Sequence, residues 1–255
     1  MKPDGLCQGR GIFLSRNIDQ IIQICSHQSS NKLLQDDEQE KTSYVVQHYL
    51  DKPHLVDDLK YDFRLYVLVY GVDPLRIYLH SMAFARFCTT PYQKPSRANL
   101  SNIYMHLTNY AINKFASEYK ECDDESGDQG HKRSLGAILQ ILEAEGCDTQ
   151  TLMLKIKDSI IKTVIAAQPQ LAHLYKICQP DCLDGSMAFQ VLGFDVLLDH
   201  KYNPYLIEVN CSPSFATDSS LDYKIKKTVI ADTFRLLNIS REKRLRVQEE
   251  YYQKI

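Results

Sequence analysis

The chain has 255 residues, and its 30 basic residues nearly balance its 32 acidic residues, which gives a formal net charge of −2. This length can bury a large core, and the charge balance excludes a general attraction to nucleic acid or anionic membranes. No stretch resembles a signal peptide or a membrane-spanning helix, and the eight cysteines form no disulfide-like framework. We therefore expect a cytoplasmic protein with reduced thiols that binds neither nucleic acid nor membrane. We also expect it to be a monomer.

The first candidate site is a glycine-rich stretch close to the N-terminus. Lys2 precedes the sequence QGRG at residues 8–11, and the apolar residues 12–14 follow it. Two glycines separated by one residue let backbone amides approach an anion, and Lys2 and Arg10 add positive charge. Because the stretch matches neither the Walker loop nor the dinucleotide-binding fingerprint, it indicates either a phosphate site or a plain glycine turn.

A short helix is predicted to begin near Asn17. Residues 26–41, which follow it, are polar and acidic with few apolar anchors, and residues 118–130 have the same character. We expect flexible loops in both places.

Residues 60–69, KYDFRLYVLV, alternate with the period of two that predicts a β-strand. One face of this strand would be apolar, and the other would carry the charges of Lys60, Asp62 and Arg64. A turn at residues 71–74 and a return strand over residues 75–79 follow. The charged face indicates either a functional site or a solvated outer face with a local ion pair.

Two further helices are predicted from apolar residues at helical spacing, and both are expected to pack on the sheet. The first ends at Gly146. Their apolar stripes consist of Leu135, Ile138, Leu139 and Leu142, and of Leu152, Ile156, Ile160 and Val164.

Near the C-terminal end, the apolar runs VLGFDVLLD and PYLIEVN are joined by the polar residues HKYN, which predicts a hairpin. If Asp199 faces Pro204, Asp195 lies directly opposite Glu208, and Asn210 shares the face of Glu208. Opposed carboxylates among apolar neighbours repel each other and need a cation. These oxygen ligands suit Mg²⁺, which commonly completes its shell with water and nucleotide phosphates. The alternative is a hairpin with two solvated acids on its outer face.

Two other features invite a metal interpretation. Cys178 and Cys182 are four residues apart, but no CxxC pair or matching histidine set accompanies them, so zinc is not expected. His106 is expected to be a structural hydrogen-bonding residue rather than a ligand.

Seven motifs occur in order along the chain: KPDxxxQGRGI, VVQxYL, KxDxR, ARF, HLTNYxINK, GFDVLLD and IEVNxSPSF. Over residues 2–239 this set resembles the tubulin–tyrosine ligase-like family, and within it the polyglutamylase branch. The resemblance implies an α+β fold of the ATP-grasp type, with antiparallel sheets and packed helices. It also implies ATP and Mg²⁺ as cofactors, and addition of L-glutamate to glutamate side chains in tubulin C-terminal tails.

The same resemblance assigns roles by position. ATP would be bound by Lys2, Gln8, Gly9, Arg10, Gly11, Gln47, His48, Tyr49, Leu50, Lys60, Asp62, Thr108 and Asn109. Magnesium would be held by Asp195, Glu208 and Asn210, and the incoming glutamate by Arg86, Tyr110, Lys132 and Lys226. Arg64 and Arg86 would be the catalytic residues, with Arg64 facing the reacting carboxylate or phosphoryl group.

The chemistry implied by the resemblance explains these residue types. Transfer of the γ-phosphoryl group of ATP converts a carboxylate into an acyl phosphate, and an amine then displaces phosphate. Charge accumulates on the phosphoryl oxygens, so cations act by positioning and electrostatic stabilisation, and no nucleophilic side chain is required. A substrate with two carboxylates requires more than one cationic partner, and the planar fork of arginine suits a carboxylate.

In the family that the chain resembles, an N-terminal domain and further nucleotide-binding sequence precede the motif lysine, which is Lys2 here. We therefore expect residues 1–240 to be an N-terminally truncated catalytic domain, followed by a basic helical extension over residues 241–255. Cys211 stands where related polyglutamylases commonly carry histidine, which puts an acid–base role at this position in doubt. Two alternatives remain: a noncatalytic microtubule-binding module that retains the family's framework, and a ligase of the family that uses glycine.

The last segment carries many bases on a helical pattern, which indicates either docking on the acidic surface of a microtubule or an ordinary solvated helix face. The resemblance implies a location at the cytoskeleton, including cilia and basal bodies. The bases concerned are Lys224, Lys226, Lys227, Arg235, Arg241, Lys243, Arg244 and Arg246.

Overall fold

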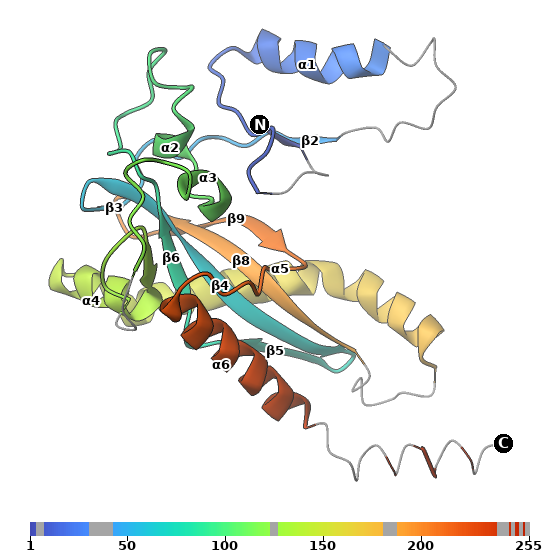
Figure 1. The fold of residues 1–255 in the computed structure, drawn as a ribbon. Helices are drawn as coiled ribbons and strands as arrows, with labels where there is room; N and C mark the ends of the chain where they lie inside the picture. The colour runs from blue at the N-terminus through green and yellow to red at the C-terminus, as the bar shows by residue number, and fades with distance from the viewer. Residues whose placement is uncertain are drawn as a thin grey trace. The chain divides into compact units, whose positions relative to one another are not determined.

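The computed structural model describes residues 1–3, 8–30, 43–122, 127–180 and 188–238, and residues 245, 248, 249 and 252 beyond them. Within these residues, helices are combined with antiparallel strands, which confirms the α+β class (Figure 1). No helix among them is long and apolar enough to cross a membrane. The six cysteines that lie within the described residues form no disulfide bond.

The chain divides into two compact units, each assembled from segments that are far apart in sequence. Unit 1 consists of Met1–Asp62, Arg86–Lys120 and Leu197–Asn203. Unit 2 consists of Phe63–Ala85, Glu121–Val196 and Pro204–Ile255.

Unit 1 contains the short strands β1 (Lys2–Pro3), β2 (Tyr44–Val45) and β3 (Leu55–Val56), and helices α1 (Ile18–Ser30), α2 (Ile103–His106) and α3 (Tyr110–Asn113). β1 and β2 pair antiparallel, with Lys2 opposite Val45. The start predicted for α1 is confirmed, since the side chain of Asn17 accepts a hydrogen bond from the backbone N–H of Asp19.

The flexible loop expected from residue 26 is wrong at its beginning, because α1 continues through Ser30. Once a helix has formed, each further residue adds a backbone hydrogen bond, so polar residues can extend it. Residues 31–41 lie outside the described residues.

A seven-stranded sheet contains β3 together with β4 (Leu59–Val72), β5 (Leu75–Leu79), β6 (Phe84–Phe87), β7 (Lys132–Ser134), β8 (Phe189–Leu198) and β9 (Pro204–Asn210). Its main order is β7-β6-β4-β8-β9, and β3 and β5 also pair with β4. β5 runs antiparallel to β4, which confirms the predicted turn and return strand. The hairpin predicted at HKYN is also confirmed, because β8 and β9 are neighbours.

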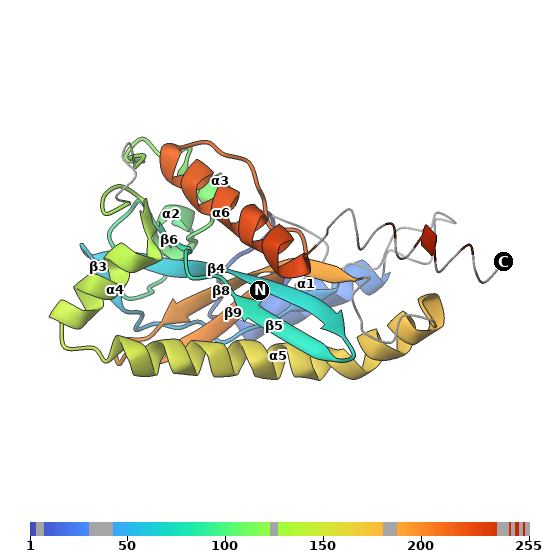
Figure 2. The same ribbon diagram turned by 90° about the horizontal axis from the view of Figure 1, so that it is seen from below.

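Unit 2 holds the helices α4 (Leu135–Ala144), α5 (Thr149–Cys178) and α6 (Ser220–Leu237). Figure 2 shows α5 and α6 on opposite sides of the sheet, with α5 along β5 and β9. Both predicted apolar stripes are confirmed as core faces of helices. The buried members are Leu135, Ile138, Leu142, Leu152, Ile156, Ile160 and Val164.

Strand β4 is covered on both faces, which contradicts the alternative of a solvated charged face. Leu65 and Val67 are fully buried on one side, while Tyr66 packs on the other side with residues of α6. Lys60 and Asp62, on the same side as Tyr66 by strand period, are only 6% and 3% exposed. Buried charged groups need partners, so this face is a candidate for a functional site.

The basic pattern of the last segment is only partly a solvent face. Lys224, Lys227 and Arg235 of α6 are exposed, but Lys226 is 7% exposed and belongs to the buried side of the helix. Arg241, Lys243, Arg244 and Arg246, with most of the expected extension over residues 241–255, lie outside the described residues.

Candidate functional site

The glycine-rich stretch of unit 1 forms a tight loop packed against α3. Gln8, Gly9 and Gly11 have positive φ values of 62°, 79° and 72°. A Cβ atom at Gly9 would lie 2.6 Å from Cδ1 of Ile112 and 3.1 Å from Oδ1 of Asn109. The positive φ therefore favours glycine here, and an added Cβ would also require the Ile112 side chain to move. Two predicted nucleotide-binding motifs, QGRG and the asparagine of HLTNY, thus lie in contact.

A chain of hydrogen bonds holds Lys60 in the same unit. The Lys60 ammonium donates to the carbonyl oxygen of His106 at 2.8 Å and to the hydroxyl of Tyr49 at 3.2 Å. Tyr49 is 2.8 Å from Nδ1 of His106, whose Nε2 is 3.0 Å from the carbonyl oxygen of Asn99. Because a carbonyl can only accept, Nε2 carries the proton and Nδ1 accepts from the Tyr49 hydroxyl. The prediction that His106 is a structural hydrogen-bonding residue is confirmed.

Electrostatics around Lys60 are suited to an anion. Burial lowers the pKa of Lys60, and the nearby Lys2 lowers it further against the opposite effect of Asp62. Burial also lowers the pKa of His106, which keeps the imidazole neutral beside the ammonium. Two lysines that disfavour each other's charge would be stabilised by a negatively charged ligand.

Arg86 and Asp62 form a buried ion pair in unit 1. Nε of Arg86 donates to Oδ1 of Asp62 at 2.9 Å, and Nη2 donates to Oδ2 in a second, shorter contact. The two residues are 8% and 3% exposed. Such a bidentate pair fixes the guanidinium plane. The resemblance assigned Asp62 to ATP and Arg86 to glutamate, whereas in the structure the two side chains bind each other.

The remaining predicted residues of unit 1 differ in their exposure to solvent. Gln47 and His48 are exposed, whereas Leu50 and Thr108 are half-buried. The ring of Tyr110 lies edge-on to Tyr119 at 6.0 Å between centroids.

In unit 2, the predicted carboxylates and amide of the hairpin converge. Nδ2 of Asn210 is 3.4 Å from Oδ2 of Asp195 and 3.2 Å from Oε1 of Glu208. Asp195 is 1% exposed, whereas Glu208 and Asn210 are half-buried, so the alternative of two solvated acids is wrong for Asp195. No cluster of three or more His, Cys, Asp or Glu side chains suited to a metal occurs in the described part of the chain. The trio itself offers two carboxylates and one amide.

The counter-ion of Asp195 is Arg64, which lies opposite it on β4. Nε of Arg64 is 2.5 Å from Oδ1 and Nη2 is 2.9 Å from Oδ2. Gly193 gives this side chain room, since a Cβ there would lie 3.3 Å from Cδ of Arg64. Burial of Asp195 does not by itself require a metal, contrary to the expectation from the sequence, because Arg64 of β4 already supplies a cation.

A second cationic cluster lies at the start of α6. Lys132 Nζ is 2.6 Å from Oδ2 of Asp222, and Lys226 Nζ is 2.7 Å from Oδ1. Both ammonium groups lie over the ring of Phe84, at 4.9 Å and 5.7 Å from its centroid. Burial lowers the pKa of Lys132, and Asp222 partly restores it. The structure thus brings two of the four residues predicted for glutamate to one place.

Sequence reasoning missed Asp222. Its signal is local: Ser219, three residues before it, is the N-cap of α6, and Lys226 follows one helical turn later. The pattern S-x-x-D predicts a capping box, and the Asp–Lys spacing predicts an ion pair.

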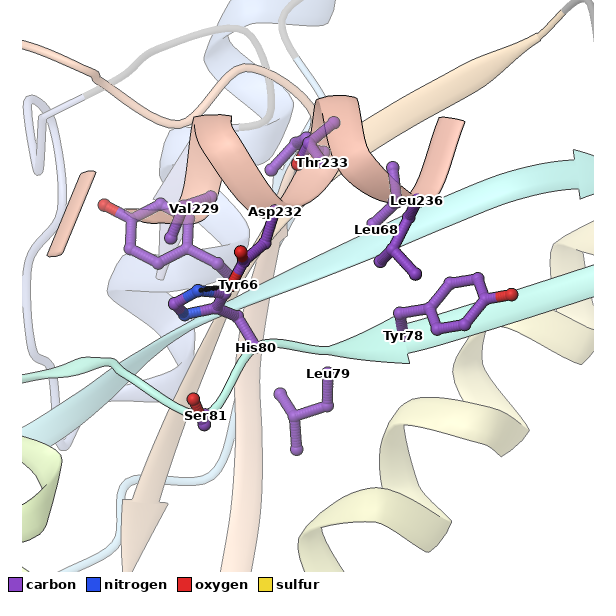
Figure 3. A pocket seen from close by; sticks show the side chains of 11 residues that line it. Tyr66, Leu68, Tyr78, Leu79, His80, Ser81, Val229, Asp232, Thr233 and Leu236 are labelled. Atoms are coloured by element: carbon purple, nitrogen blue, oxygen red, sulfur yellow. Dashed lines mark ion pairs between the residues drawn. The ribbon is translucent and has the colours of Figure 1, made fainter. Parts of the chain in front are cut away.

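A cavity of about 250 Å³ lies elsewhere in unit 2, between α6 and the strands β4 and β5 (Figure 3). Figure 3 shows His80 beside Asp232, with Nε2 and Oδ2 3.3 Å apart. None of the predicted site residues lines this cavity.

The fold and the buried cationic clusters define a protein equipped to hold anionic ligands. The family model described as "Tubulin-tyrosine ligase family" matches residues 1–246. The chain belongs to the tubulin-tyrosine ligase family, whose ligases are ATP-dependent.

Three relatives illustrate the similarity. The chain is 49% identical to "Probable beta-tubulin polyglutamylase" of Tetrahymena thermophila over 93% of its own length and 19% of that protein. It is 41% identical to "Tubulin polyglutamylase ttll6" of Danio rerio over 98% of its length and 29% of that protein. It is 42% identical to "Tubulin polyglutamylase TTLL13" of Homo sapiens over 98% of its length and 28% of that protein. The chain thus spans less than a third of these curated relatives.

Proposed function

We propose that this chain is the ATP-grasp ligase core of a tubulin polyglutamylase, which adds L-glutamate to glutamate side chains in tubulin C-terminal tails. The relatives that carry this name match more than nine-tenths of the chain. The structural observation that carries the proposal is the pair of buried lysines, Lys132 and Lys226, held by one carboxylate over one aromatic ring. Two cations buried at one place suit an amino acid such as glutamate, whose side chain carries a second carboxylate.

ATP would be held by residues of unit 1. Lys2 lies near enough to Lys60 to lower the pKa of Lys60. The glycine loop packs on Asn109. Phosphate oxygens would satisfy both ammonium groups, and backbone amides exposed by the positive-φ residues would add hydrogen bonds. Tyr49, which belongs to the VVQxYL segment expected to bind ATP, positions Lys60.

The residues that would hold Mg²⁺ are Asp195, Glu208 and Asn210. Their convergence through Asn210 fits such an ion, since hard oxygen ligands are what it prefers, and the amide can present its oxygen after a flip of the side chain. When bound, the ion would neutralise charge on the nucleotide phosphates. Arg64 binds Asp195, which is also one of the residues proposed to hold the ion. Its guanidinium would stabilise the negative charge on the transferring phosphoryl oxygens.

The reaction would proceed in two steps. A γ-carboxylate oxygen of a tail glutamate attacks the γ-phosphorus of ATP, the bond to the β-phosphate oxygen breaks, and ADP leaves. The amine of the incoming glutamate then attacks the acyl phosphate carbon, loses a proton, and expels inorganic phosphate. The residues' part is to position both substrates and to stabilise developing negative charge. The resemblance also assigns Arg86, which Asp62 holds, and Tyr110 to the incoming glutamate.

The test is incorporation of radiolabelled L-glutamate into brain tubulin by the 255-residue chain with MgATP, beside the Tetrahymena relative as a positive control. Tubulin whose tails have been removed by subtilisin is the matched negative substrate. Glutamate incorporation that needs ATP and the tails, with ADP released, supports the proposal. Tubulin binding without ADP release would favour the noncatalytic module, and preferential incorporation of glycine would change the amino-acid substrate. Either result would overturn the proposal.

A further inference from the structure

The two lysines proposed for glutamate do not stand alone, because each binds a different oxygen of Asp222. The distances are 2.6 Å from Lys132 and 2.7 Å from Lys226, and the Asp222 residue is 1% exposed. Both lysines are themselves only 7% exposed. Three charged side chains are thus buried together, contributed by β7 and α6, which lie far apart in the chain.

The position of Asp222 is fixed from its own backbone. Its N–H donates to Oγ of Ser219 at 3.1 Å, and the Ser219 hydroxyl lies 3.2 Å from Oδ2 of Asp222. These two contacts tie the carboxylate to the N-cap residue of α6. Lys226, one turn further along the same helix, also donates to the carbonyl oxygen of Ala216. The lysine is therefore held from two sides.

Without Asp222, the two ammonium groups would face each other in a poorly solvated place. Burial disfavours each charge, and like charges repel strongly at low dielectric. Asp218 also attracts Lys132, but Asp218 is exposed, so solvent screens its effect. The Phe84 ring stabilises both cations from one side only. One buried carboxylate offsets this repulsion and holds the two ammonium groups close together.

We propose that Asp222 is a positioning residue for the incoming amino acid: it holds Lys132 and Lys226 as one charged pair that receives a carboxylate of glutamate. The inference rests on the proposed function and adds a residue to it. This role explains why a buried aspartate lies at a site proposed to bind an anion. A site for a carboxylate needs cations that are ionised and fixed in place, and Asp222 holds the two lysines. The three formal charges sum to +1 and leave attraction for one further carboxylate.

The experiment compares Asp222→Asn, Asp222→Glu and wild type in the tubulin glutamylation assay. Asp222→Asn is expected to raise KM for glutamate at least tenfold while KM for ATP changes less than twofold. Asp222→Glu keeps the charge and the capping pattern and should recover much of the loss. Asp232→Asn is the matched control, because Asp232 is on the same helix but pairs with exposed Arg235 at 2.5 Å. It should behave like wild type.

Glutamate binding is also measured by the rise in melting temperature that saturating L-glutamate causes, which requires no turnover. Folded Asp222→Asn and Asp222→Glu proteins with the wild-type KM and melting shift would overturn the inference. So would equal increases in KM for glutamate and ATP, since these would indicate a general structural defect. A wild-type chain that incorporates no glutamate would instead contradict the proposed function, and the melting shift would then still show whether Asp222 supports glutamate binding.

Discussion

Arg64 and Asp195 lie directly opposite each other on β4 and β8, and the arginine binds both oxygens of the carboxylate, at 2.5 Å through Nε and 2.9 Å through Nη2. The side chain of Asp195 is 2% exposed and that of Arg64 is 14% exposed. The arginine thereby offers a buried carboxylate two hydrogen bonds and holds it in place within the sheet. Because Asn210 reaches the same carboxylate, this pair joins the charged strand to the hairpin trio.

Loss of this arginine should be costly for the fold. Arg64→Leu would leave Asp195 buried without its bidentate partner, and we expect the free energy of unfolding to fall by about 3 kcal/mol. Urea denaturation followed by circular dichroism measures this. Lys162→Ala provides the control, because Lys162 pairs with Asp158 at the surface, where the side chains are 73% and 59% exposed. That change should alter the free energy by about 0.5 kcal/mol or less.

Glu208→Gln tests the proposed magnesium site. It removes one of two neighbouring carboxylates, so the apo protein should be as stable as wild type or slightly more stable. Magnesium-dependent binding of ATP, measured by calorimetry with and without EDTA, should be lost, and ligation with it. Wild-type turnover in the variant would exclude a metal role for Glu208.

Gly9→Ala tests the glycine loop. The new Cβ would require a strained backbone at φ 79° and would lie 2.6 Å from Ile112. We expect a loss of about 1–2 kcal/mol in unfolding free energy, mainly from the backbone strain, with weaker ATP binding. Gly136→Ala is the matched control, because Gly136 lies in α4 with nothing within 4 Å of an added Cβ. Alanine there should stabilise by about 0.5 kcal/mol. Equal effects of the two substitutions would mean that the loop tolerates a side chain.

Arg86→Lys tests the amino-acid site of unit 1. Lysine cannot reproduce the two parallel hydrogen bonds to Asp62, so the cation would be less well placed. We expect KM for glutamate to rise about tenfold, equivalent to about 1.4 kcal/mol, with little change in ATP affinity. An unchanged KM for glutamate would remove Arg86 from the amino-acid site and leave it as a structural partner of Asp62.

The stability of the protein at acid pH should depend on the charge of Asp222. Burial raises the pKa of Asp222, but Lys132 and Lys226 more than offset this and hold it below its ordinary value of 3.8. A lowered folded-state pKa contributes stability that is present above pH 3.8 and is lost as pH falls through the folded pKa. Asp222→Asn should therefore be less stable than wild type at neutral pH, and the two urea midpoints should converge below pH 3.8. A difference that stayed constant down to acid pH would mean that the charge of Asp222 does not stabilise the fold.

The sequence alone determined the local features of this protein. Alternation from Phe63 to Val69 predicted β4, the HKYN turn predicted the β8–β9 hairpin, and apolar spacing predicted the buried faces of α4 and α5. Each of these depends on residues a few positions apart, where backbone geometry dictates which side chains share a face. Ordered motifs likewise indicated the family that the comparison confirms.

Only the tertiary structure decided which charges meet. Asp62 pairs with Arg86 across 24 positions, Lys132 with Asp222 across 90, and Arg64 with Asp195 across 131. Periodicity assigns a residue to a face but does not say which distant strand or helix covers that face. The register between strands and the packing of α6 determine which charged residues meet. A buried charge is stable only where the folded chain brings an opposite charge to it.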